Sequence, residues 1–262
     1  MKRFITSLLW VFSLSLFSIN AQDKIDADNR VTLVAAQIFD EILVNGDITV
    51  ECQFKPELHR YIVYNTTENT DKRIICHNDS NRLIINGDNQ RDMVASRIVV
   101  FCNDSLKAVI MNGSGNILIK ETPRLKRFHI IQNANGAIKI GNLQSHFLSI
   151  VNNGPGSILT KEVKARRLSM LNNGNGELKF KSIKAFNGTF ILNSNTNVAF
   201  DDILVRKASF ITNGNGSFSL KGKTNELTLT SNNAGNIDAS ELSHKTIISS
   251  QSNSSGYIKT KK

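Results

Sequence analysis

The chain has 262 residues, with 32 Lys or Arg against 22 Asp or Glu and a formal net charge of +10. This length is typical of one large domain or two small ones. Hydrophobic residues make up 40% of the sequence, which is enough to bury a core and excludes a wholly disordered chain. Asparagine occurs 31 times, whereas Pro occurs 3 times and Trp once.

Residues 1–22 have the three parts of a secretory signal peptide: Lys2 and Arg3, an apolar run over residues 4–19, and a small-residue exit at Ala21. The run holds four serines and is short of the ~20 apolar residues of a span, which favours a cleaved signal over a retained anchor. We therefore expect an exported protein that is periplasmic, associated with the outer membrane, or secreted. No transmembrane segment is expected after signal removal.

Loss of Lys2 and Arg3 would lower the formal charge from +10 to +8. A basic surface favours anionic partners such as polysaccharide, lipid headgroups or nucleic acid. Export makes nucleic acid the least suitable of these, so no nucleic-acid partner is predicted.

A repeat of about 20 residues dominates the rest of the sequence. Small residues of recurring turns lie 19 to 21 residues apart, at Gly115, Gly136, Gly156, Gly176, Thr196, Gly216, Gly235 and Gly256. Three residues before each lies an asparagine: Asn112, Asn133, Asn153, Asn173, Asn193, Asn213, Asn232 and Asn253. Two residues after each lies an apolar residue: Ile117, Ile138, Ile158, Leu178, Val198, Phe218, Ile237 and Ile258.

One repeat has the pattern of an apolar strand, an Asn-Gly turn and a second strand that alternates apolar and polar residues. The period of two and the density of Gly and Asn exclude a helix. About 20 residues at ~3.3 Å each can circle a narrow core once. We predict an all-β fold, a parallel β-helix (β-solenoid) of about eight coils. Residues 109–260 would form the regular repeats and residues 23–108 irregular strands and hairpins that cap its end, together one domain over residues 23–262.

The fixed offset of the asparagines predicts a structural ladder, because coils stacked ~4.8 Å apart let each amide bond to its copy in the next coil. The alternative is that Asn merely suits turns, where we also expect glycines at positive φ. Acids occur in alternate repeats, at Glu121, Glu162, Asp202 and Glu241. The basic pairs Lys126-Arg127, Arg166-Arg167 and Arg206-Lys207 keep the same rhythm, and skipping a coil separates like charges.

For two neighbouring columns, the sequence does not decide which one faces the core and which one faces the solvent. Five residues before the turn position the column is apolar (Ile110, Ile131, Val151, Leu171, Ile191, Ile211), and four before it is mostly polar (Gln132, Asn152, Asn172, Thr212). Strict alternation places one of them outside. In one alternative the apolar column is an exposed ridge for docking or dimerisation. In the other, the strand is bent and both columns point inward.

Few groups of residues in the sequence suggest a catalytic or metal-binding site. Glu162 and Asp202, two coils apart with Arg166-Arg167 nearby, are the best candidates for glycoside cleavage, but a solvated charge stripe explains them better. The five histidines have no ligand spacing, and the turns lack the acids of a calcium β-roll. No catalytic, cofactor or metal residue is predicted. The three cysteines, Cys52, Cys76 and Cys102, are either core residues or include one disulfide pair.

The turns at residues 112–117 (Asn-Gly-Ser-Gly-Asn-Ile) and 213–218 (Asn-Gly-Asn-Gly-Ser-Phe), with the opening at residues 42–50, resemble the autotransporter adhesin "head GIN" domain family of exported Bacteroidetes proteins. The resemblance covers most of residues 30–260. It implies a right-handed β-helix, a cell-envelope location and an adhesin-like role. This chain departs from the family by placing Asn where the family usually has Ser, and by Thr196 in place of Gly.

We therefore hypothesise a noncatalytic exported adhesin or surface or periplasmic interaction module. Its partner would be a protein or a polysaccharide at the cell envelope. The alternative is a β-helical carbohydrate-active protein that acts on or binds anionic polysaccharide.

Overall fold

The computed structural model describes residues 30–66, 74–87, 97–251 and 255–261. The predicted signal peptide and Asn253 lie outside these residues. Residues Val31–Lys262 form one compact unit, and the following description concerns that unit.

The described chain contains strands and one short 3-10 helix, η1 (Pro56–Leu58). The strands are β1 (Arg30–Ala35), β2 (Glu41–Asn45), β3 (Thr49–Phe54), β4 (Tyr61–Thr66), β5 (Ile74–Asp79), β6 (Arg82–Gly87), β7 (Arg97–Cys102), β8 (Ala108–Met111), β9 (Asn116–Gln132), β10 (Ala137–Asn152), β11 (Ser157–Asn172), β12 (Leu178–Leu192), β13 (Val198–Thr212), β14 (Phe218–Ser231), β15 (Ile237–Ser243), β16 (Thr246–Gln251) and β17 (Ile258–Thr260).

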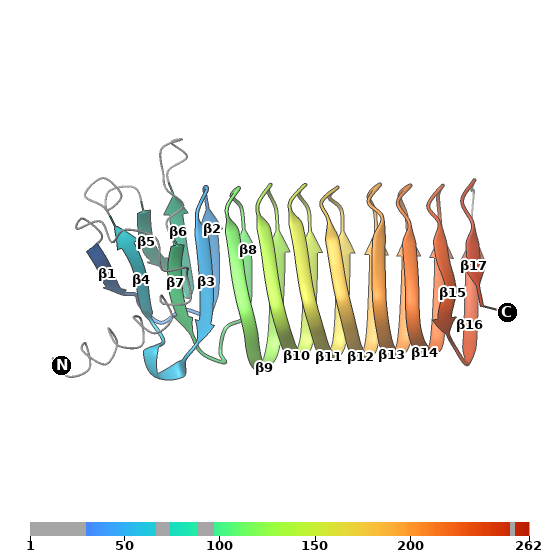
Figure 1. Ribbon diagram of the computed structural model, residues 1–262, viewed down its shortest axis with the longest axis horizontal. Coiled ribbons are helices and arrows are strands. Elements are labelled where there is room, and N and C mark those ends of the chain that lie inside the picture. The colour runs from blue at the N-terminus through green and yellow to red at the C-terminus, as the bar shows by residue number, and fades with distance from the viewer. Residues whose placement is uncertain (1–29, 67–73, 88–96, 252–254, 262) are drawn as a thin grey trace, which may run out of the picture. The chain divides into compact units, whose positions relative to one another are not determined.

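Strands β9 to β14 are the regular coils of a parallel β-solenoid. Each bends midway, so its two legs lie in opposite walls, with the Asn-Gly turns at the upper side of Figure 1 and the bends at the lower side. Equivalent residues pair in register from coil to coil, for example Ile138 with Ile117 and with Ile158. The predicted fold class is confirmed, with about seven turns rather than eight.

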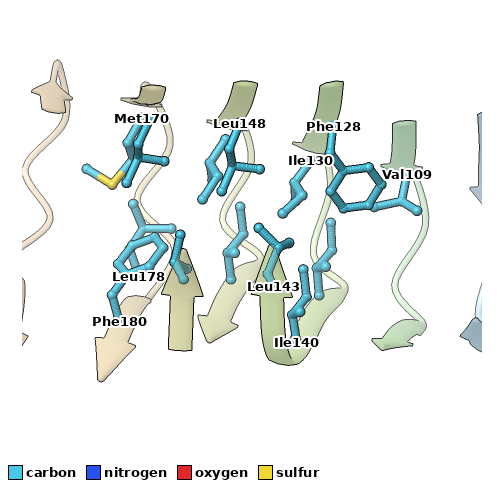
Figure 2. Packing of buried hydrophobic residues seen from close by; sticks show 14 of the residues in the cluster. Val109, Phe128, Ile130, Ile140, Leu143, Leu148, Met170, Leu178 and Phe180 are labelled. Atoms are coloured by element: carbon cyan, nitrogen blue, oxygen red, sulfur yellow. The ribbon is translucent and has the colours of Figure 1, made fainter. Parts of the chain in front are cut away.

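The core lies between the two walls. Apolar residues before the turns point toward apolar residues after them, and Figure 2 shows one row (Val109, Phe128, Ile130, Leu148, Met170) facing another (Ile140, Leu143, Leu178, Phe180). Farther along, aromatic rings stack between coils, with 4.5 Å between the ring centroids of Phe190 and Phe210. Each coil thus buries its apolar columns only against its neighbours, as solenoid repeats do.

The irregular N-terminal region extends the parallel stacking instead of only capping it. Strand β2 pairs in parallel with β6 on one side and β8 on the other, and β3 likewise pairs with β7 and β9. The coil formed by β2 and β3 therefore lies between later segments of the chain. Antiparallel pairing joins β5 with β6 and β4 with β7.

The reason why glycine occupies the turn positions differs from the expected one. Among the described glycines, only Gly46 and Gly222 have a positive φ, so the expectation of positive φ in the repeated turns was wrong. Their backbones instead touch the next coil: a Cβ added at Gly176 would lie 1.8 Å from the carbonyl oxygen of Gly156. Glycine is required there because consecutive turns approach too closely for a side chain.

Thr196 carries a side chain at the equivalent position, and its Oγ1 donates to the Gly174 carbonyl oxygen at 3.3 Å. Strands β12 and β13 begin to pair at Lys179 and Ala199. The preceding pair, β11 with β12, begins one position earlier, at Ile158 and Leu178. The same one-residue shift separates β11–β12 from β10–β11, which begin to pair at Ala137 and Ser157, so it also occurs where both turns keep their glycine.

The three cysteines are free thiols. Cys52 and Cys102 are buried, and Cys76 is half-buried. A hydrogen bond with the Cys52 thiol, followed by burial, raises the pKa of Cys102.

Burial raises the pKa of Cys76 to about 11. Because only the thiolate attacks, we expect Cys76 in the folded protein to react with iodoacetamide at pH 8 roughly 100-fold more slowly than after unfolding, and its rate to rise about tenfold per pH unit up to pH 10. Peptide mapping by mass spectrometry would measure the rate at this site. Equal rates in the folded and unfolded chains would contradict the shift.

Candidate functional site

The repeated asparagines lie side by side along the turns. Each side-chain Nδ2 donates to the Oδ1 of the asparagine one coil earlier: Asn133 to Asn112 (2.8 Å), Asn153 to Asn133 (2.9 Å), Asn173 to Asn153 (2.9 Å), Asn193 to Asn173 (2.8 Å), Asn213 to Asn193 (2.8 Å) and Asn232 to Asn213 (2.6 Å). Most of these side chains are exposed. We call this series the asparagine ladder.

A further asparagine pair of this kind, which the repeat did not predict, lies in the N-terminal region. Asn45 Nδ2 donates to Asn86 Oδ1 at 2.6 Å, and the two residues are register partners in β2 and β6. Both asparagines directly precede a glycine, as Asn112 does in the regular turns. The Asn-Gly dipeptide was therefore the available signal, although the spacing of the repeat does not extend to them.

The structure decides between the two orientations of the neighbouring columns. The polar column points inward, with Gln132, Asn152, Asn172 and Thr212 fully buried, and the apolar column is half-exposed on the outer wall. The inward residues bond to each other or to turn carbonyls. Asn152 Nδ2 donates to Asn172 Oδ1 at 2.9 Å, and Thr212 Oγ1 donates to the Gly216 carbonyl at 3.2 Å. Buried turn carbonyls need such donors, which explains why polar residues occupy the core side.

The candidate catalytic carboxylates do not converge. Glu162 is the register partner of Ser182, whose Oγ donates to Asp202 at 2.9 Å, so the two acids are separated by one intervening coil. The neighbouring basic residue Arg167 lies in a different column, with Asn187 and Lys207.

Glu162 is held as an ion pair. Its carboxylate lies 2.9 Å from Lys164 Nζ and 3.0 Å from Lys184 Nζ. Hydrogen bonds from Lys164 and then Lys184 lower its pKa. A general acid for glycoside cleavage needs the opposite shift, so this geometry supports a structural role.

A groove of about 890 Å³ lies on the wall that follows the turns. Five lysines line it: Lys120, Lys139, Lys161, Lys179 and Lys181. We call it the lysine groove. All five side chains are exposed, and they project from the consecutive strands β9 to β12.

The register produces the alternation within the lysine groove. Lys139 pairs with Leu118 on one side and Leu159 on the other, so one column alternates Leu and Lys. In the neighbouring column Gly141 lies directly against the preceding coil, because a Cβ there would lie 2.1 Å from the Lys120 carbonyl oxygen. The groove therefore combines ammonium groups with a shallow apolar floor.

The acid at one end of the groove is already compensated. Glu51 is 2% exposed and forms an ion pair with Arg97 and accepts a hydrogen bond from Gln53 Nε2 at 2.9 Å. The charge of Glu51 therefore does not cancel the lysines. A second acid, the exposed Glu121, also lines the groove, where the lysines outnumber it five to one. The sequence signal for the groove was a lysine three or five residues after the turn position in successive repeats.

A second basic surface follows the bends opposite the turns. It comprises the exposed residues Lys126, Arg127, His146, Phe147, Arg166, Arg167, Phe186, Leu204, Arg206 and Lys207, and we call it the bend edge. Arg127 and Arg167 flank the Phe147 ring, with their Cζ atoms 5.6 and 5.5 Å from its centroid. Arg206 Cζ lies 4.8 Å from the centroid of Phe186. The sequence had indicated the basic pairs but not the exposed apolar residues between them.

Among the described residues, no group of three or more His, Cys, Asp or Glu side chains is arranged to hold a metal ion. No helix within the described ranges is both long and apolar enough for a membrane span.

Comparison with known families identifies the chain. The family described as "Putative auto-transporter adhesin, head GIN domain" matches residues 38–189 and 159–261. The chain belongs to this family. The comparison with curated proteins finds no match.

Several solved structures have a similar fold. A putative adhesin from Parabacteroides distasonis is 16% identical with a TM-score of 0.74, and one from Parabacteroides merdae is 16% identical with a TM-score of 0.70. A putative adhesin from Bacteroides fragilis is 14% identical with a TM-score of 0.60. Each alignment covers 90% of this chain and 98% of the other. At such identities the likeness shows the solenoid fold alone.

Proposed function

We propose that this head GIN protein is an exported, noncatalytic binding module of the cell envelope, and that its lysine groove captures an anionic polysaccharide. The observation that carries the proposal is the set of five exposed lysines around one groove of about 890 Å³. Ammonium groups spaced along stacked strands can each contact a carboxylate or sulfate of an extended polymer. The adhesin-like family supports a binding role.

Catalysis has less support than binding. The carboxylates of Glu162 and Asp202 lie apart and are bonded to lysines and a serine hydroxyl. Incubating the protein with an acidic polysaccharide should release no oligosaccharides. Turnover of the polymer would contradict the noncatalytic role.

The binding proposal predicts a localised charge dependence. The variant Lys139→Gln/Lys179→Gln removes two groove cations, each contributing about 1 kcal/mol near an anionic surface. We expect its affinity for alginate, a linear polyuronate, to fall at least roughly tenfold. Isothermal titration calorimetry at low and high salt would measure the change, with neutral dextran as the uncharged polymer.

The matched control is Lys245→Gln/Lys261→Gln, which removes the same charge from exposed positions outside the groove. Its affinity should stay within about twofold of the unmodified protein, since distant charges are screened. Equal losses of alginate affinity in the two variants, or equal binding of dextran and alginate, would refute specific binding of an anionic polysaccharide by the lysine groove.

A further inference from the structure

The bend edge has a composition that the lysine groove does not share. Three apolar side chains protrude from it, with exposed fractions of 40% for Phe147, 44% for Phe186 and 51% for Leu204. Around them lie six Lys or Arg residues and one histidine, without a carboxylate in the set. Contact of these apolar side chains with water is unfavourable. Apolar side chains that are grouped on a surface and rimmed by charged residues indicate an interaction site.

The cations of the bend edge are largely uncompensated. Within the described part of the chain, Arg127, Arg166 and Arg206 have no carboxylate within ion-pair distance. Compensation appears only at the C-terminal end of the edge, where Lys207 Nζ lies 2.8 Å from Glu226. The edge is therefore complementary to a surface that carries many negative charges.

Stacking makes the bend edge straight. Arg127, Phe147 and Arg167 are successive register partners in β9, β10 and β11, and their column continues through Asn187 to Lys207. Successive members lie about 4.8 Å apart because that is the spacing of paired strands. All belong to the bends along one side of the solenoid (Figure 1). A straight row can touch a flat surface along its whole length.

From this geometry we propose that the bend edge docks the protein onto an anionic lipid surface, with the Phe186 and Leu204 side chains entering the interfacial region. Leu204 and the Phe rings have no polar atom with which to bond a hydrated glycan, whereas burial in the acyl boundary of a bilayer is favourable for them. The arginine and lysine groups would meet lipid phosphates while their stems cover the apolar tips. This interaction is separate from the lysine groove, whose residues lie in other columns.

Co-sedimentation with vesicles tests the docking. The chain from residue 23 onward contains the whole compact unit Val31–Lys262 and lacks the apolar leader, which would itself bind lipid. We expect it to bind vesicles of phosphatidylglycerol and phosphatidylcholine, and not vesicles of phosphatidylcholine alone. Both Phe186→Ser/Leu204→Ser and Arg166→Gln/Arg206→Gln should lower the apparent affinity at least tenfold. The matched control Lys245→Gln/Lys261→Gln, at exposed positions outside both basic surfaces, should leave it unchanged.

Tryptophan fluorescence tests the depth of insertion. The only Trp of the sequence, Trp10, is absent from the shortened chain, so Phe186→Trp supplies a single fluorophore. Its emission should shift to shorter wavelength on addition of anionic vesicles. Tyr257→Trp, at an exposed residue beside the last strand, should show no shift.

Three results would overturn the proposal. The first is vesicle binding that survives both bend-edge variants, and the second is vesicle binding that the groove variant weakens equally. The third is a combination of two observations: the unmodified chain does not bind vesicles, and Arg166→Gln/Arg206→Gln loses alginate binding. The bend edge would then be a polysaccharide-binding surface. Failure of the groove experiment with intact vesicle binding would refute the proposed function and leave the docking inference standing.

Discussion

Gly176→Ala should lower the melting temperature by several degrees. The added Cβ would lie 1.8 Å from the Gly156 carbonyl oxygen and 2.7 Å from that of Pro155, both rigid backbone atoms. The two coils must separate to admit it, which weakens the hydrogen bonds on either side. An overpacking cost of about 3 kcal/mol corresponds to a fall of roughly 6–12 °C in Tm for a domain of this size, measurable by circular dichroism.

Asn175→Ala provides the control for this steric prediction. Asn175 is exposed at the tip of the same turn, so its replacement should change stability by less than about 0.5 kcal/mol. Equal melting shifts in the two variants would show that coil contact does not select the glycine.

Asn172→Ala is expected to have the other large effect. Its side chain is fully buried, accepts a hydrogen bond from Asn152 Nδ2 at 2.9 Å and donates one to Ser194 Oγ at 2.9 Å. Truncation leaves a buried donor unpaired and creates a cavity, at a combined cost of about 2–4 kcal/mol. Urea denaturation would measure the change in the free energy of unfolding.

Leucine replacements separate the two causes. Leu192 occupies the next position of the same column, so Asn172→Leu fills the volume but still leaves the Asn152 donor unpaired. The double variant Asn152→Leu/Asn172→Leu removes both polar partners, and also the Asn152 Oδ1 that is buried without a hydrogen bond. We expect it to recover much of the lost stability, since removing both partners costs less than orphaning one. A double variant less stable than either single one would contradict this account.

The exposed asparagine ladder should contribute less than the buried column. Asn173 is bonded to Asn153 and Asn193, but water can replace these partners at the surface. We expect Asn173→Ala to cost about 1 kcal/mol, which is more than Asn175→Ala and less than Asn172→Ala. Equal melting temperatures for Asn173→Ala and Asn175→Ala would exclude a stabilising ladder.

Sequence spacing was sufficient to predict the fold because a solenoid repeats one local rule. A column such as Ile117, Ile138 and Ile158 is both a sequence period and a set of register partners. The same period placed Asn112 beside Asn133 and Glu162 two coils from Asp202. It failed for residues 23–108, where β2 lies between β6 and β8, since a non-sequential order of coils leaves no period to detect.

The amino-acid sequence alone determined the coil length, the stacked columns and the basic pairs at the bends, because each follows from one residue type recurring at one offset. Only the tertiary structure decided that Asn172 faces the core while Leu171 faces outward, and that Gly176 is selected by contact with Gly156. It also assembled the lysine groove and placed Phe186 and Leu204 among the cations of the bend edge. These features depend on which atoms of neighbouring coils are in contact. The sequence does not predict those contacts, because the alternation of inward and outward side chains is interrupted at every turn and bend.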